Sequence, residues 1–165
     1  MQKILLISDT HSHLDPKLFK YIETVDEVWH AGDIGDIKVC LEIEKLKPLK
    51  AVYGNIDGQE ARKLYPENTI FMCEQVKVFI THIGGYPNRY NLEAKKIIDQ
   101  QQPNLFICGH SHILKVMYDK KYNLLHLNPG ACGVHGFHQV KTVLRFAIEG
   151  AEIKNMEIVE LGKRA

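Results

Sequence analysis

The stretch Ile4-Leu5-Leu6-Ile7-Ser8-Asp9-Thr10-His11-Ser12-His13 decides both the fold and the site, and the rest of the chain extends from it. Its four consecutive apolar residues predict a strand that is buried on both faces. The strand ends at Asp9 and His11, and the carboxyl ends of such strands are where α/β proteins bind ligands. Side chains two positions apart share a side of an extended chain, so an oxygen and a nitrogen ligand for a divalent metal would lie together. Taken alone, the pair is better explained by Asp9 as a turn cap and His11 in solvent, and the rest of the chain reverses this preference.

The length of the chain predicts a single domain over residues 1–165, large enough to bury its own core. The formal net charge of +1 argues against an extended nucleic-acid surface, and no apolar stretch is long enough to cross a membrane. The four cysteines stand far apart, which is typical of reduced thiols. The first apolar run is too short for a signal peptide. We therefore expect a cytoplasmic protein that acts on a small substrate.

Strands and helices alternate in the first part of the chain. Helices are expected after Asp15-Pro16 and after Asp36, where a capping carboxylate precedes an apolar stripe. Strands are expected over 27–31 and 49–53, and each runs into glycine and a polar residue. This order of elements is typical of a parallel sheet.

The remainder of the chain predicts hairpins and one further helix. We expect a hairpin over 68–81, a helix over 91–101 and a strand over 105–108. Two later hairpins, over 116–126 and 140–159, show no helical stripe, and we expect them to form a second sheet. The fold class is therefore α/β.

Polar side chains directly follow five apolar strands. They form the motifs Asp9-x-His11, Gly32-Asp33, Gly54-Asn55, His82 and Gly109-His110-x-His112. Each motif is ordinary by itself, because Gly-Asp and Gly-Asn occur in many turns and a lone histidine is often a core residue. Since all five stand at the same kind of position, we expect one sheet to carry them together. They supply two carboxylates, one amide oxygen and four imidazoles.

Seven ligands are too many for one tetrahedral site, so they indicate two adjacent metal ions that share a carboxylate. Two divalent ions carry four positive charges, of which Asp9 and Asp33 cancel two. The remaining charge attracts an anionic substrate, and paired ions stabilise both the attacking and the leaving oxygen of an in-line displacement. The ligand set therefore favours hydrolysis of a phosphate ester.

In this order, the five motifs resemble those of the calcineurin-like metallophosphoesterases, and the chain length resembles their small single-domain phosphodiesterase branch. Asn128-Pro129-Gly130 resembles a turn that this branch carries after the last motif. The resemblance implies a four-layer α-β-β-α sandwich, in which helices flank two mixed β-sheets. It also implies a phosphodiesterase in which a metal-bridging hydroxide attacks phosphorus.

The resemblance further assigns the ligands. The implied set is Asp9, His11 and His112 for the first metal, Asn55, His82 and His110 for the second, and Asp33 as the bridge. Asn55 would also orient a phosphoryl oxygen. Manganese is the favoured metal, and iron, zinc, nickel, cobalt or magnesium are alternatives for these oxygen and nitrogen ligands.

One position departs from the family pattern. Many members follow the asparagine with a histidine that protonates the leaving group, whereas this chain has Ile56. An isoleucine cannot donate a proton, so the candidate donors are His13, His30 or a metal-bound water, unless no donor exists. We therefore expect aryl phosphodiesters, which have good leaving groups, to react far faster than alkyl ones.

Three alternatives stay open at this point. The fold also serves as a scaffold in a eukaryotic retromer subunit with a degraded metal pocket, but here all seven ligand positions carry competent side chains. A phosphomonoesterase fits the same ligands, while the near-neutral charge disfavours a nuclease that acts on long nucleic acid. The chain could also form a homo-oligomer. His135 and His138 lie in a loop over 133–138 that we expect to be an ordinary loop rather than a cover over the site.

Overall fold

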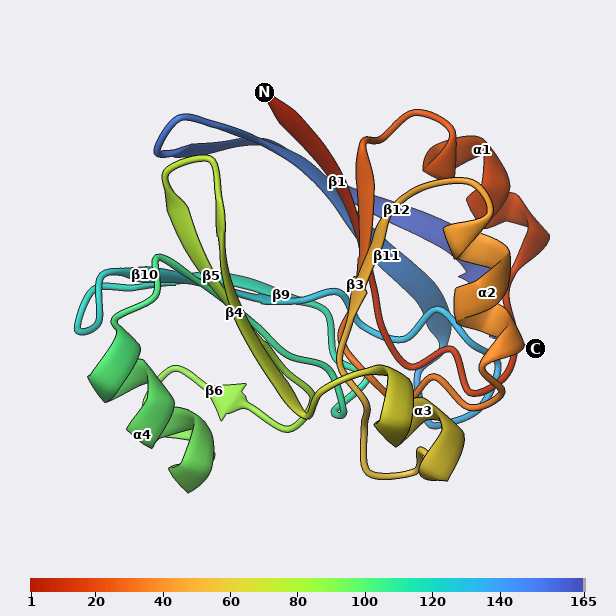
Figure 1. Cartoon of the computed structure of the whole chain (residues 1–165), viewed down its shortest axis with the longest axis horizontal. Coiled ribbons are helices and arrows are strands. Elements are labelled where there is room, and N and C mark those ends of the chain that lie inside the picture. Colours follow the sequence, from red (N-terminus) through yellow and green to blue (C-terminus); the bar gives the residue numbers. More distant parts are fainter. Residues whose placement is uncertain (165) are drawn as a thin grey trace.

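The computed structural model describes residues 1–164, and its strands form two five-stranded sheets and one small two-stranded sheet (Figure 1). The first sheet has the order β12 (Glu152–Lys163), β11 (Val140–Glu149), β1 (Gln2–Ile7), β2 (Glu27–His30) and β3 (Leu49–Ala51). The second has the order β4 (Asn68–Cys73), β5 (Val76–Thr81), β8 (Leu105–Ile107), β10 (Leu124–Asn128) and β9 (Lys115–Asp119). The small sheet pairs β6 (Gly85–Tyr86) with β7 (Arg89–Tyr90). The helices are the 3₁₀ helix η1 (Pro16–Leu18), α1 (Phe19–Ile22), α2 (Lys38–Glu44), α3 (Gln59–Leu64) and α4 (Leu92–Gln101).

Strand β1 is the centre of the first sheet. It pairs in parallel with β2 and antiparallel with β11, which makes the sheet mixed. Leu5 and Ile7 face the core beneath the helices, whereas Ile4 and Leu6 face the core between the two sheets. Each of these side chains is fully buried, which contributes about 1.5–3 kcal/mol per residue. The predicted strand with two buried faces is confirmed.

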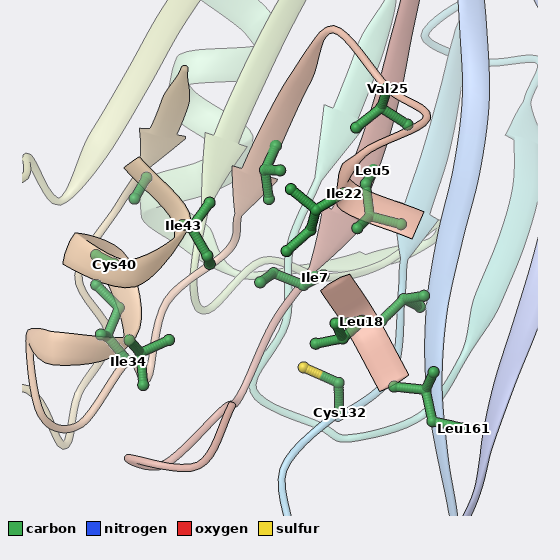
Figure 2. Close-up of a cluster of buried hydrophobic side chains, with 14 of the residues drawn as sticks. Leu5, Ile7, Leu18, Ile22, Val25, Ile34, Cys40, Ile43, Cys132 and Leu161 are labelled. Carbon is green, nitrogen blue, oxygen red and sulfur yellow. The ribbon is translucent and has the colours of Figure 1, made fainter. Parts of the chain in front are cut away.

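The two sheets face each other, and helices cover the outer face of each. Leu18 of η1, Ile22 of α1 and Ile43 of α2 pack on the first sheet (Figure 2). On the other side of the molecule, Ile98 of α4 packs with Phe106 of the second sheet. The result is the predicted four-layer α-β-β-α sandwich, with α1, α2 and α3 on one side and α4 on the other (Figure 1).

The predicted place of the hairpin over 140–159 is wrong. Strands β11 and β12 extend the first sheet rather than the second, with Arg145 of β11 opposite Leu5 of β1. β11 is buried on both faces, since Leu144 lies in the core between the sheets and Val143 lies in the core beneath the helices. An apolar pattern shows that a strand is buried but does not show which sheet it joins. The hairpin over 116–126 does lie in the second sheet, as β9 and β10.

The longest helix is confirmed, while three short elements escape the sequence patterns. α4 begins after Asn91, whose side chain accepts hydrogen bonds from the N–H groups of Glu93 and Ala94. α3 buries only Ala61, so it has no apolar stripe that would reveal it. β6 and β7 are two residues long, too short for alternation to show. Within residues 1–164, no helix is long and apolar enough to span a membrane.

Strand β9 forms one edge of the second sheet. Its side chains Val116, Met117 and Tyr118 are exposed. An edge of this kind can pair with a strand of another chain. The homo-oligomer stays a prediction, and β9 is the strand that we expect to form its interface.

Candidate metal centre

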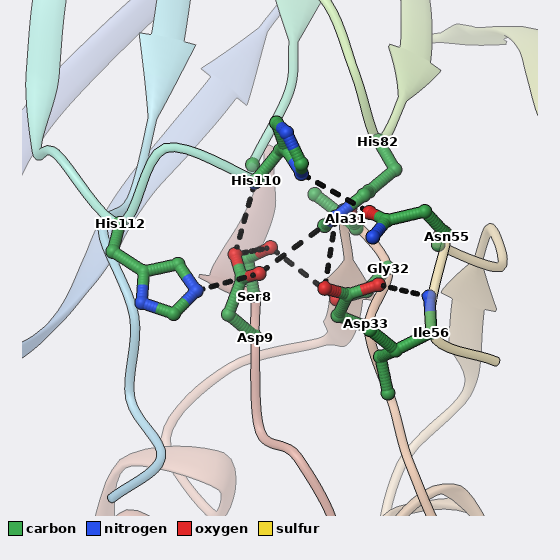
Figure 3. Close-up of polar contacts among 12 residues, drawn as sticks. Ser8, Asp9, Ala31, Gly32, Asp33, Asn55, Ile56, His82, His110 and His112 are labelled. Atoms are coloured by element: carbon green, nitrogen blue, oxygen red, sulfur yellow. Dashed lines mark hydrogen bonds and ion pairs between the residues drawn. The ribbon is translucent and has the colours of Figure 1, made fainter. Parts of the chain in front are cut away.

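The polar residues that follow the strands meet at one end of the two sheets (Figure 3). Asp9, Asp33 and Asn55 follow β1, β2 and β3 of the first sheet, whereas His82 and His110 follow β5 and β8 of the second. The expectation that one sheet carries all five motifs is therefore wrong. Two facing sheets end at the same place, and each contributes part of the site.

Six of the predicted ligands form two clusters, in each of which the possible ligand atoms lie within 4.8 Å of one another. The first cluster comprises Asp9, His11 and His112, and the second comprises Asp33, His82 and His110. Asn55 lies beside the second cluster, with its Oδ1 3.0 Å from Nδ1 of His110. The histidines of Gly-His-x-His thus enter different clusters, as the family resemblance implies.

The backbone at the clusters departs from that of a strand. Five ligand residues have positive φ angles, between 45° and 71°. They are Asp9, His11, Asp33, His110 and His112. An extended chain has negative φ, so the alternation of a strand does not apply to them. Such conformations cost on the order of 1–3 kcal/mol each and concentrate at functional sites.

Two glycines allow the loops of the two sheets to approach each other. A Cβ on Gly32 would lie 2.7 Å from Nδ1 of His82, and a Cβ on Gly109 would lie 2.8 Å from Oδ2 of Asp9. Both separations are too short for unbonded heavy atoms, so any other residue would push the loops apart. The glycines in these motifs therefore allow the loops of the two sheets to come into contact, in addition to forming the turns.

Asp33 lies between the two clusters. Its Oδ2 is 3.4 Å from Nε2 of His11 in the first cluster and 3.2 Å from Nε2 of His82 in the second. Its Oδ1 accepts a hydrogen bond from the backbone N–H of Ile56 at 3.1 Å, which fixes the orientation of the carboxylate. One oxygen of Asp33 thus faces a histidine of each cluster.

The clusters combine buried carboxylates with imidazoles. Burial disfavours the charge on Asp9 and Asp33, but the neighbouring histidines outweigh it and hold the pKa of both carboxyls well below their usual range. The facing carboxylates of Asp33 and Asp9 raise the pKa of His11 to about 9. The same carboxylates raise the pKa of His82 against the effect of burial. Both carboxylates are therefore ionised at neutral pH, as metal ligands must be.

Several atoms at the centre of the site lack a protein partner. Oδ1 of Asp9, Nε2 of His11 and Nε2 of His82 are buried and form no hydrogen bond within residues 1–164. Each unpaired polar atom of this kind costs about 1–3 kcal/mol unless something binds it. Carboxylate oxygens and imidazole nitrogens without thiolates suit divalent ions of the first transition series. The residues present therefore fit a pair of divalent metal ions.

Comparison with known proteins gives a family that matches this fold. Residues 2–151 match the family model of the calcineurin-like phosphoesterase superfamily domain. The chain belongs to this superfamily. A Methanothermobacter thermautotrophicus protein named "Probable metallophosphoesterase" is 26% identical to this calcineurin-like domain over 162 residues, which cover 95% of this chain and 91% of the relative.

Solved structures share the fold of the calcineurin-like domain at low sequence identity. A predicted phosphoesterase from Streptococcus pneumoniae is 20% identical, with a TM-score of 0.72 over 96% of this chain and 89% of the other. Wild-type Vps29 from Entamoeba histolytica, solved in complex with Zn²⁺, is 18% identical, with a TM-score of 0.73 over 99% of both chains. At such identities the comparison shows the fold alone.

Neither histidine that was expected as a proton donor belongs to a cluster. His30 is fully buried, with Nδ1 accepting from the N–H of Gly32 at 3.1 Å and Nε2 3.0 Å from Oγ1 of Thr10. Burial lowers the pKa of His30 to about 4. His30 therefore supports the loop that carries Asp9, and it cannot reach a leaving group. His13 is half-buried, and its role as a donor stays a prediction.

The loop over 133–138 is not the ordinary loop expected from its sequence. The ring of His135 lies against that of His11, with centroids 4.9 Å apart. His138 is buried, and its Nδ1 lies 3.1 Å from Nδ1 of His112. No spacing rule marks these two residues, because they reach the first cluster only through the path of the folded chain.

Asn128 of the Asn-Pro-Gly turn supports the Gly-His-x-His loop of the calcineurin-like domain. Its Nδ2 donates to the carbonyl of Gly109 at 3.0 Å and to Oγ of Ser111 at 3.1 Å. Its Oδ1 accepts from the N–H of Gly130 at 3.0 Å. The Asn-Pro-Gly turn thus holds the loop that carries the proposed ligands His110 and His112.

Asp57 is a supporting residue that the sequence patterns do not reveal. Its buried carboxylate accepts hydrogen bonds from the backbone N–H groups of Ile34 at 3.1 Å, Gly35 at 2.8 Å and Gly54 at 2.7 Å. It therefore ties the loop after β2 to the loop after β3. Its only sequence signal is a position three residues after Gly54, where aspartate is also ordinary in a turn.

We expect Asp57→Ala to lower the free energy of unfolding of the metal-free protein by about 3 kcal/mol, because two buried N–H groups and one part-buried N–H group lose their acceptor. Urea denaturation measures this change. Asp36→Ala is a matched control, since the carboxylate of Asp36 is exposed and accepts one hydrogen bond, from the N–H of Lys38 at 2.9 Å. The control should cost about 1 kcal/mol or less, and equal effects of the two variants would contradict the role of Asp57.

Proposed function

We propose that the chain is a phosphodiesterase that works with two divalent metal ions. In this proposal Asp9, His11 and His112 hold the first ion, Asn55, His82 and His110 hold the second, and Asp33 bridges them. What carries the proposal is the position of Asp33, whose Oδ2 lies 3.4 Å from His11 and 3.2 Å from His82, one histidine from each cluster. A carboxylate that faces both clusters offsets the repulsion between two dications.

The bound ions supply positive charge for the phosphoryl group and lower the pKa of the attacking water. The chain's own groups bind and orient the substrate around that charge. In this proposal the amide of Asn55, whose Oδ1 lies 3.0 Å from Nδ1 of His110, donates a hydrogen bond to a phosphoryl oxygen. Ile56, the next residue, offers no proton to the leaving group.

Two cavities that border the second cluster support a diester as substrate. One of about 430 Å³ is bordered by Asn55 and His82, and another of about 240 Å³ is bordered by His110 and Arg89. A phosphodiester carries an organic group on each of two ester oxygens, whereas a monoester carries one. These two cavities, which adjoin at Ile83 and Asn91, match the two arms of a diester.

Manganese is the metal we favour, with zinc as the main alternative. The ligands are carboxylate oxygens, an amide oxygen and imidazoles, which suit both ions. The Vps29 structure solved with Zn²⁺ has the same fold, which supports zinc as a second choice.

Metal-stripped protein tests the proposal when Mn²⁺ is added back. We expect two Mn²⁺ ions to bind each chain and to restore hydrolysis of an aryl phosphodiester. The rate should exceed that on the matched monoester by about tenfold, or roughly 1.4 kcal/mol of transition-state free energy. A monoester preference would overturn the diester assignment. Metal binding without turnover of either ester would favour the scaffold alternative, and no metal binding would overturn the proposal entirely.

A further inference from the structure

His138 contacts the proposed metal ligand His112 on the side of its ring that faces away from Asp9. Its side chain is 9% exposed, and its Nδ1 lies 3.1 Å from Nδ1 of His112. The other nitrogen of His138, Nε2, lies 2.8 Å from the carbonyl oxygen of Gly133. Across the ring of His112, Nε2 lies 3.2 Å from Oδ1 of Asp9, inside the first cluster.

These contacts determine where the protons lie. The carbonyl oxygen of Gly133 can only accept, so Nε2 of a neutral His138 carries the proton and Nδ1 of His138 has a free lone pair. That lone pair can face Nδ1 of His112 at hydrogen-bond distance only if the latter carries a proton. Neutral His112 then has its lone pair on Nε2, the atom that faces Asp9. A chain of two hydrogen bonds thus selects the tautomer of His112.

The segment that carries His138 is held in place on several sides. The guanidinium of Arg164 donates through Nε to the carbonyl of His138 at 2.8 Å, and the N–H of Gly133 donates to the carbonyl of Asp9 at 3.2 Å. Gly136 has a φ of +129°, and a Cβ there would overlap the ring of His112. The backbone is therefore packed directly on His112, and glycine is required for that approach.

We propose that His138 is a positioning residue, which holds His112 as the Nδ1–H tautomer and so presents Nε2 to the first metal ion. The inference rests on the proposed two-metal site and adds a residue that none of the five strand-end motifs contains. Hydrogen-bond partners of metal-binding histidines fix the ring orientation and raise the basicity of the ligand, and their loss costs about 10- to 100-fold in metal affinity. We expect that loss at one of the two sites only.

Two variants separate the hydrogen bond from the shape of the side chain. His138→Leu fills a similar volume without an acceptor, whereas His138→Gln keeps an acceptor oxygen. Calorimetric titration of the metal-stripped proteins with Mn²⁺ at pH 8 should show one site weakened about 10- to 100-fold in His138→Leu and largely restored in His138→Gln. Phe137→Ala is the matched control, because this neighbouring side chain is fully exposed, and it should bind Mn²⁺ like the wild type.

A second measurement needs no variant. Nitrogen NMR of the metal-free wild-type protein at pH 8 should show His112 protonated on Nδ1, and a dominant Nε2–H tautomer would overturn the proposal. Wild-type affinity at both sites in folded His138→Leu would also overturn it, while leaving the two-metal site intact. A wild-type protein that binds no Mn²⁺ would instead overturn the proposed function, so the two failures are distinguishable.

Discussion

Asp33→Asn should abolish metal-dependent hydrolysis, with a fall of about 1,000-fold in kcat/KM, or roughly 4 kcal/mol of transition-state free energy. Oδ2 of Asp33 lies within 3.4 Å of a histidine from each cluster. The substitution replaces this anionic oxygen by a neutral amide group, so the repulsion between two dications is no longer offset. The amide oxygen of asparagine can still accept the hydrogen bond that Ile56 N–H makes at 3.1 Å, and we expect the fold to persist.

The measurement is kcat/KM on an aryl phosphodiester with saturating Mn²⁺, together with the number of Mn²⁺ ions bound per chain. Asp99→Asn is the matched control, because it makes the same charge change at an exposed position of α4 outside both clusters. Activity near wild type in Asp33→Asn would contradict the bridging role. A comparable loss in Asp99→Asn would attribute the effect to net charge rather than to the site.

Ile56→His should raise the rate on alkyl phosphodiesters by about 100-fold, because general acid catalysis contributes on the order of 10²–10⁴. Alkoxide leaving groups are strongly basic and need a proton, whereas aryl leaving groups depart without one. The Ile56 side chain is 47% exposed, directly after Asn55, and its backbone is tied to Asp33. An unperturbed imidazole has a pKa of about 6.5, which suits proton donation near neutral pH. Rates on aryl diesters should change little.

Matched aryl and alkyl diesters, assayed with the wild type and the variant, test this prediction. Ile56→Gln serves as the control, since glutamine is polar and of similar size but carries no titratable proton. The wild type should strongly prefer the aryl substrate, and the variant should narrow that preference. Equal wild-type rates on both substrates would show that another group protonates the leaving oxygen, and His13 would be the first residue to examine.

Some features follow from local sequence because they depend on residue type and short spacing. The run from Ile4 to Ile7 predicts a strand with two buried faces, and alternation divides it between two cores as expected. Asn91 predicts the start of α4, because its side chain can accept the first free N–H groups of the helix. Ligand chemistry also belongs to residue types, so the carboxylates and imidazoles that meet in the two clusters are recognisable from the strand ends.

Other features depend on contacts between distant segments, which no local window of sequence contains. The apolar pattern of β11 predicts burial, but it does not reveal that β11 pairs with β1 of the first sheet. His110 and His112 enter different clusters, whereas Asp9 and His11, with the same spacing and the same positive φ, share one, so spacing alone does not reveal the grouping. Asp57 and His138 act through hydrogen bonds to other loops. By itself the sequence determined which strands are buried and which side chains can bind metal, since both are local properties. The grouping of the ligands follows from the sequence only through the family resemblance. Only the tertiary structure decided which sheet β11 joins and which residues hold the ligand loops, because register and layering depend on the whole chain.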